Sequence, residues 1–159
     1  MTDTDVTAAE LAALPLFEGL PEGELADLAA RSSRRRLADG ETLLDQGEPA
    51  RDVYAIVSGR LVLRTADERS AAIVANLGPG DILGWSALRE AATALSSAKA
   101  AAETVLVAIP ADAVVELASG GSRESRGLLR RLIAVAAADL EASRVQLLRS
   151  GREGVITGG

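Results

Sequence analysis

The 159-residue chain contains no histidine and no cysteine. Metal sites built on imidazole or thiolate ligands are therefore excluded, as are the Ser-His and Cys-His pairs of nucleophilic enzymes. Only three aromatic side chains are present, Phe17, Tyr54 and Trp85, too few for a platform on which single-stranded nucleic acid could stack. The formal net charge of −6 also disfavours binding to a phosphate backbone. We therefore predict a protein without enzymatic activity, without a metal site and without direct contact to nucleic acid.

Long hydrophobic runs are also missing. The most apolar stretch, LLRRLIAVAAADL, is broken by charged residues well before the roughly 18 to 20 residues that a bilayer-spanning helix needs. The first residues are acidic and lack the basic residues that open a secretory signal. We therefore expect a cytoplasmic protein that makes no contact with membranes. The apolar fraction of 48% and the charged fraction of 25% are typical of one folded globular domain.

Residues 1–33 are predicted to form a helical segment. Turn signals interrupt the helical pattern twice, and Pro21 is suited to the first position of a helix over 22–31. The residues expected on the inward face of this segment are Leu20, Leu25 and Leu28.

Residues 34–110 show a different pattern, in which short apolar runs alternate with turn signals. Several such runs at intervals of about ten residues are typical of an antiparallel sandwich or barrel. Ser58-Gly59 is the strongest hairpin signal, because strand-like sequences flank it and glycine tolerates the positive backbone angle of a tight turn. The runs that we predict as strands are 34–38, 41–46, 53–58, 60–66, 70–77, 81–85 and 103–109.

Residues 111–150 return to a helical pattern. A short helix over 111–118 is stopped by Ser119-Gly120-Gly121, and a long helix follows over 122–150. The glycine-rich residues 151–159 are predicted to form a flexible tail or linker.

Six positions of the predicted long helix follow the alternating four- and three-residue spacing of a heptad seam. Two interpretations stay open: the seam pairs with a second copy of the helix, or it packs on the sandwich of its own chain. Residues 122–159 carry seven arginines against four acidic residues, whereas the rest of the chain carries ten basic against nineteen acidic residues. This basic helix could dock on its own body, on a twin or on an acidic partner, or present an ordinary solvated face. The seam positions are Leu129, Ile133, Ala136, Leu140, Ser143 and Leu147.

The glycine-rich sequence at 78–81 leads towards a short helical stretch at 85–89. Backbone N–H groups at such a junction point towards one spot, an arrangement that suits an anion such as phosphate. The alternative is a turn that needs glycine for its backbone geometry and binds nothing.

Four short segments stand in a characteristic order: LPLFEGL at 14–20, GETLLDQGEPA at 40–50, VYAIVSGRL at 53–61 and LGPGDILG at 77–84. This pattern resembles the cyclic-nucleotide-binding domain of the catabolite-activator superfamily. The resemblance implies an α+β, mainly β fold, an antiparallel β-sandwich or jelly-roll of about eight strands with a helical N-terminal segment and a long C-terminal helix. In that family the long helix serves both in dimerisation and as a lid over the ligand.

The resemblance also implies a phosphate-binding cassette within 78–95. The family's cassette reads roughly Gly-Glu-Leu-Ala-Leu, followed after a variable stretch by an arginine and a small polar residue; the glutamate receives the ribose hydroxyl and the arginine holds the cyclic phosphate. In this sequence Trp85 stands at the glutamate position, and the arginine position falls at about Ala94, with Leu95 beside it. The site residues implied for any ligand are Gly84, Trp85, Ser86, Ala87, Leu88, Ala94, Leu95 and Ser96.

Three roles for Trp85 stay open: it fills the pocket as core, it reshapes the pocket for a flatter and less polar ligand, or it only weakens a cyclic-nucleotide site. Arg89 or Lys99 could supply the cation, or each could be an exposed surface charge. Loss of a buried guanidinium–phosphate pair would lower the affinity for a cyclic nucleotide by about two or more orders of magnitude.

We therefore predict a non-catalytic regulatory or sensor domain with weak or no binding of cAMP or cGMP and no other cofactor. It would act through a homodimer formed by its C-terminal helix, or through a protein partner. One alternative is a genuine sensor of a cyclic nucleotide or another small ligand. A second alternative is an effector domain excised from a larger regulator or shell protein. Because the chain ends about nine residues after the predicted helix, we expect no DNA-binding domain to follow that helix.

Overall fold

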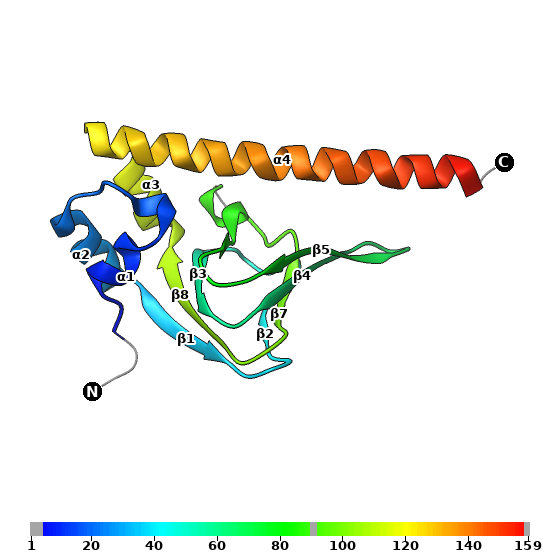
Figure 1. Cartoon of the computed structure of the whole chain (residues 1–159), viewed down its shortest axis with the longest axis horizontal. Coiled ribbons are helices and arrows are strands. Elements are labelled where there is room, and N and C mark those ends of the chain that lie inside the picture. The colour runs from blue at the N-terminus through cyan, green and yellow to red at the C-terminus, as the bar shows by residue number, and fades with distance from the viewer. Residues whose placement is uncertain (1–4, 90–91, 158–159) are drawn as a thin grey trace.

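The computed structural model describes residues 5–89 and 92–157, without the side chain of residue 74 and most side chains after residue 138. Two four-stranded antiparallel sheets form a barrel-like sandwich, and helices cover one side of it (Figure 1). The α+β, mainly β fold expected from the sequence is therefore confirmed. The strands are β1 (Ser33–Leu37), β2 (Thr42–Leu44), β3 (Asp52–Ser58), β4 (Leu61–Ala66), β5 (Ala71–Leu77), β6 (Ile82–Leu83), β7 (Ser97–Ala100) and β8 (Thr104–Pro110).

The two sheets have the strand orders β1-β8-β3-β6 and β2-β7-β4-β5. Alternate residues of each strand point between the sheets, where Tyr54, Ile56, Leu61 and Leu106 are buried in one apolar cluster. Strand β7 is not among the runs predicted from the sequence. Its sequence Ser-Ala-Lys-Ala has little β-propensity. These residues form a strand because they pair with β2 on one side and β4 on the other.

The prediction of a hairpin at Ser58-Gly59 is wrong. Strand β3 pairs with β8 and β6 in one sheet, whereas β4 pairs with β5 and β7 in the other, so the turn carries the chain from sheet to sheet. Gly59 has a φ of +94°, and a Cβ atom on it would overlap the carbonyl oxygen of Glu103. Glycine is needed at this corner because two backbone segments approach each other closely there. The local sequence does not distinguish such a corner between sheets from a hairpin turn, since both favour glycine.

The helices cover the outer face of the sheet that contains β3 and β8. Leu20, Leu25 and Leu28 are buried there, as predicted, against the strand residues Val107 and Ile109. Helix α2 begins one residue after Pro21, which is its N-cap residue rather than its first helical residue. The helical elements are α1 (Ala8–Ala12), η1 (Pro15–Phe17), α2 (Glu22–Arg31), η2 (Trp85–Leu88), α3 (Ala111–Ala118) and α4 (Arg123–Thr157).

Helix α4 runs along the length of the molecule, and its C-terminal part extends past the sandwich (Figure 1). Its N-terminal part is fixed to the body by the buried residues Leu128 and Leu132. Arg131 adds two hydrogen bonds, from Nε to the carbonyl of Leu16 (2.8 Å) and from Nη2 to the carbonyl of Glu18 (2.6 Å). No helix in the described ranges is both long and apolar enough to cross a bilayer.

The predicted heptad seam does not form this contact with the body. Leu129, Ile133 and Leu140 are 44%, 60% and 63% exposed, and Ala136 is exposed as well. The side chains of Ser143 and Leu147 lie outside the described ones. The interpretation in which the seam packs on its own sandwich is therefore wrong for the described positions, because a neighbouring face of the helix makes that contact.

Helix α4 also ends later than predicted. It continues to Thr157, so residues 151–157, which we expected to be a flexible tail or linker, are helical in the structure. Glycine and polar residues lower helix propensity by only about 1 kcal/mol each, which an established helix can tolerate at its end.

Candidate functional site

The cassette begins at a glycine-rich turn that is tied to strand β3. The N–H of Gly78 donates to the carboxylate of Asp81 (2.9 Å), and the N–H of Gly80 donates to the carbonyl of Ile56 (2.9 Å). Gly84, with a φ of +91°, follows β6 and caps η2; a Cβ atom on it would lie 2.7 Å from the carbonyl oxygen of Asp52. Backbone geometry alone therefore accounts for glycine at position 84.

The short helix η2 places its side chains towards the helical layer. Trp85 and Leu88 are half-buried and pack against the cluster that joins the N-terminal helices, α3 and the start of α4. Ala87 is buried against Val53 and Ala111. The indole therefore packs on the helix side of the β3–β8 sheet, whereas the cluster between the two sheets holds Tyr54 as its aromatic residue. Ser86 is half-buried in the same short helix.

The second half of the predicted site, residues 94–96, lies against a different part of the sandwich. Ala94 is buried; its N–H donates to the carbonyl of Glu48 (2.8 Å), and its carbonyl accepts from the N–H of Gly47 (2.9 Å). Leu95 is 62% exposed, and Ser96 Oγ lies 2.7 Å from Thr65 Oγ1. Residues 47–54 thus contact both halves of the site, one at each end of the segment.

Neither of the two candidate replacement cations is buried. Arg89 is exposed. Lys99 lies between Ala98 and Ala100, which are 0% and 3% exposed on the inner face of the sheet, so its side chain points to the outer face. Across the described residues, no arginine or lysine is buried. The region between Gly84 and Ala94 therefore contains no buried cation among the described residues.

Tyr54 is a core residue of the sandwich beside Gly84. It is 7% exposed, and its ring lies 3.3 Å from the position that a Cβ atom of Gly84 would take. Burial, reinforced by the negative charge of Asp52, raises the pKa of its phenol, while Arg35 opposes this change. The phenol therefore stays neutral at physiological pH, so that Tyr54 contributes an apolar ring and one uncharged hydroxyl group beside Gly84.

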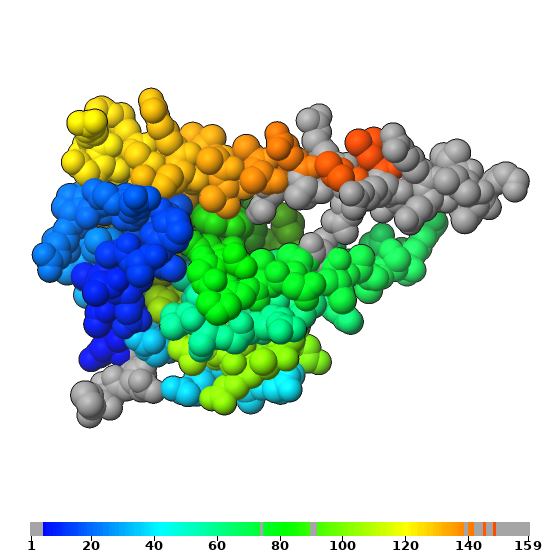
Figure 2. Space-filling model, viewed as in Figure 1, coloured from blue at the N-terminus to red at the C-terminus, as the bar shows by residue number. Residues whose placement is uncertain are grey.

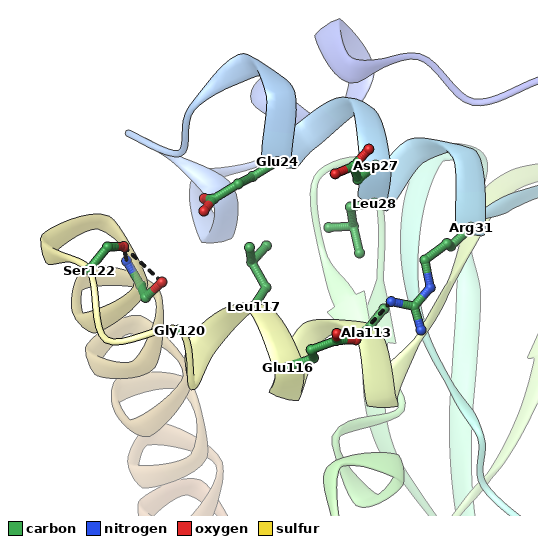
Figure 3. A pocket seen from close by; sticks show the side chains of 10 residues that line it. Glu24, Asp27, Leu28, Arg31, Ala113, Glu116, Leu117, Gly120 and Ser122 are labelled. Atoms are coloured by element: carbon green, nitrogen blue, oxygen red, sulfur yellow. Dashed lines mark hydrogen bonds and ion pairs between the residues drawn. The ribbon is translucent and has the colours of Figure 1, made fainter.

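A second feature, which sequence analysis did not single out, is a hollow of about 250 Å³ between α2, α3 and the start of α4 (Figure 3). Arg31 bridges its mouth with an ion pair to Glu116 (3.0 Å). Glu24 and Asp27 also line it, and Oε2 of Glu24 is buried without a hydrogen-bond partner among the described residues. These residues are far apart in sequence, and only the packing of α2 on α3 brings them together.

Comparison with known proteins identifies the family to which this fold belongs. A model of the family described as cyclic nucleotide-binding domain matches residues 34–120, more than half of the chain. The chain is 38% identical over 85 residues to the acetyltransferase Pat of Mycolicibacterium smegmatis, covering 54% of this chain and 26% of that protein. It is 36% identical over 100 residues to the cyclic AMP receptor protein of Thermus thermophilus, covering 60% of this chain and 44% of the receptor.

A solved structure supports the same fold. The crystal structure of a cyclic nucleotide-binding domain from Methylobacillus flagellatus KT superposes with a TM-score of 0.71, at 20% identity, over 86% of this chain and 78% of that one. The chain spans less than half the length of both curated relatives, so it corresponds to one part of them. With the family match over the whole sandwich and the cassette, this chain belongs to the cyclic nucleotide-binding domain family.

Proposed function

We propose that this chain is a non-catalytic regulatory domain of the cyclic nucleotide-binding fold whose cassette binds cAMP and cGMP weakly or not at all. The observation that carries the proposal is the combination of Trp85, Ala94 and Leu95 at the cassette positions where the resemblance implies a glutamate, an arginine and its small polar neighbour. The scaffold that presents these positions is intact, but the charged groups that would read the ligand are absent from them.

Electrostatics explains why these positions decide affinity. A cyclic phosphate that leaves water needs a cation or several charge-assisted hydrogen bonds, because an unpaired anion in a low-dielectric site is costly. Ala94 is buried and both of its backbone polar groups are bonded to residues 47 and 48, so position 94 offers neither charge nor a free amide. The missing pair corresponds to a few kcal/mol, or about two orders of magnitude in affinity.

Titration calorimetry with cAMP and cGMP tests this proposal. We expect the wild-type chain to bind both more weakly than about 100 μM. Because Ala94 is buried, the arginine is introduced at the neighbouring position, which is 62% exposed and accepts it without a buried clash; the double variant Trp85→Glu/Leu95→Arg should bind at least about tenfold more tightly. Trp85→Gln/Leu95→Gln is the matched uncharged control. Micromolar or tighter binding by the wild-type chain would overturn the proposal.

The output of the domain, in this proposal, is self-association through α4. Leu129, Ile133 and Leu140 form an exposed apolar stripe on the helix, while other residues of α4 already fix it to the body. Burial of such a stripe against a second copy would remove several exposed aliphatic side chains from water, at about 25 cal/mol for each Å² of apolar surface. Because both copies of the helix carry the same net positive charge, burial of the apolar stripe, and not electrostatic attraction, would drive a contact between the two helices.

A cyclic-nucleotide sensor is the second candidate, because one relative is named a cyclic AMP receptor protein. Trp85 distinguishes the two candidates, since it is the chain's single tryptophan and lies within the cassette. A saturable change in its fluorescence on addition of cAMP, together with a rise in melting temperature, would favour the sensor.

A further inference from the structure

The four edges of the two sheets are not equally protected. Strand β1 carries three consecutive arginines, β2 has three residues and β6 has two, and charge or shortness each discourages the addition of another strand. Strand β5 has seven residues, AAIVANL, with neither charge nor proline. It is the last strand of its sheet, and the β4–β5 hairpin projects from the body (Figure 2). Of the four edge strands, β5 therefore has the fewest features that would prevent an additional strand from pairing with it.

The register of β4 and β5 shows which backbone groups face outward. The N–H of Asp67 donates to the carbonyl of Ser70 (2.9 Å), which makes these residues a hydrogen-bonded pair. Such pairs alternate along an antiparallel ladder with pairs whose N–H and C=O groups point away from each other. Ala71 and Ile73 occupy the alternate positions, so their backbone groups point to the open edge. Both side chains are exposed, and a bulge after Ile73 limits the regular edge to residues 71–73.

A hollow of about 320 Å³ on the outer face of the same sheet adjoins this edge. Val62 and Ile73 give it an apolar part, and Ile73 is 50% exposed. Arg64 and Lys99 give it two cations, neither of which makes a side-chain ion pair or hydrogen bond with any residue in the described ranges. Asp45 is the one carboxylate in the lining, so the hollow carries a charge of +1 on a body that is acidic outside α4.

From these two features we infer that strand β5 and the adjoining hollow bind an extended segment of a partner protein in which an apolar and an acidic residue stand two positions apart. The segment would add to β5 by backbone hydrogen bonds to Ala71 and Ile73, as peptides add to exposed sheet edges elsewhere. Residues two positions apart point to the same face of a strand, so the apolar one would lie against Ile73 and the carboxylate would approach Arg64 on the neighbouring strand β4. This site is separate from both the cassette and the stripe on α4.

A synthetic peptide tests the inference on the full chain. The probe is a fluorescein-labelled heptapeptide with capped ends, Thr-Val-Thr-Glu-Thr-Val-Thr, in which valine and glutamate share one face of the strand, and its binding is followed by fluorescence anisotropy. We expect saturable binding below about 1 mM that weakens at least about tenfold in Ile73→Lys and in Arg64→Glu/Lys99→Glu. Val57→Lys is the matched control, because Val57 is 45% exposed at the end of β3 in the other sheet. Backbone hydrogen exchange should slow at residues 71–73 when the peptide binds.

Several results would overturn the assignment. These are no saturation up to about 1 mM, equal binding of the same peptide with lysine in place of glutamate, unchanged binding by Ile73→Lys, or protection of strands other than β5. Self-association of the wild-type chain that Ile73→Lys abolishes would assign the edge to a second copy instead. Circular dichroism of each variant establishes that it is folded, which is expected because the substituted side chains are exposed.

Discussion

Leucine and isoleucine on neighbouring faces of α4 provide a direct test of how this helix is used. Leu128 is fully buried against the helical layer, whereas Ile133, on the next turn, is 60% exposed. Replacing Leu128 by alanine leaves a cavity in a packed cluster and should cost about 3 kcal/mol. Replacing Ile133 by alanine removes a side chain of which less than half is buried within the chain, so its cost to an isolated protomer should stay below about 1 kcal/mol.

These costs translate into melting temperatures. For a chain of this size, 1 kcal/mol corresponds to roughly 2–4 °C, so Leu128→Ala should melt roughly 6–12 °C below the wild type at every protein concentration. If α4 mediates a dimer, the wild-type melting temperature should rise with protein concentration, and Ile133→Ala should remove most of that rise. Sedimentation velocity on both variants would report the oligomeric state directly.

Two results would refute this reasoning. An Ile133→Ala variant as unstable as Leu128→Ala at low concentration would mean that the seam face packs within the chain. A wild-type protein that stays monomeric and melts at the same temperature over a hundredfold range of concentration would remove the dimer from the proposed function. Its cassette would then have to act through a different output.

Three further predictions concern the scaffold. Gly59→Ala should destabilise the fold by more than about 2 kcal/mol in urea unfolding, because the new Cβ overlaps the carbonyl of Glu103. Gly40→Ala is the control: Gly40 has a φ of +85° but open space around it, so its substitution should cost about 1 kcal/mol. Equal costs for the two variants would contradict the close approach of the backbones at Gly59. Hydrogen bonds from two backbone N–H groups lower the pKa of the Asp67 carboxyl. The ionised carboxylate therefore stabilises the β4–β5 hairpin at every pH above the ordinary pKa of aspartate, and this stabilisation is lost as the pH falls through the lowered pKa of the folded state. Hydrogen exchange of the wild type and of Asp67→Ala should differ at neutral pH and converge in strong acid. Arg131→Ala should lose about 1–3 kcal/mol with its two hydrogen bonds to the N-terminal segment, and an unchanged melting temperature would show that water replaces them.

Much of the helical structure could be predicted because proline and glycine mark its limits in the sequence. Helix α2 begins directly after Pro21, and α3 lies between Pro110 and the stop at Gly120, at the residues expected. These signals act through φ and through the missing N–H of proline, which are local properties. The inward leucines followed from the helical period for the same reason.

Strand pairing was less predictable. The corner at Gly59 looked like a hairpin because both flanking strands and the turn residue suit one, yet β3 and β4 belong to different sheets. Strand β7 gave no signal at all, since alanine and serine are ordinary in helices and loops. In both cases the pairing depends on how the whole sandwich closes, and no local window contains that information.

The cassette lies between these cases. Its positions are an expectation from the resemblance, whereas the exposure of Arg89 and Lys99 agrees with their interpretation as surface charges. The direction of Trp85 could not be predicted, because an indole can pack on either side of η2 and the helical layer alone makes one side apolar. The hollow between α2 and α3 was missed because its carboxylates are separated by nearly a hundred residues of sequence, Glu24 from Glu116.

By itself the sequence determined the mainly β class, the limits of two helices, the absence of histidine and cysteine chemistry, and the uncharged residues at positions 85, 94 and 95. Each of these depends on residue identity or on local backbone preference. Only the tertiary structure decided which face of α4 is free, which strands share a sheet, where the indole packs and which sheet edge stays open. Those features depend on contacts between segments distant in sequence, whose partners are chosen by the burial of the whole core.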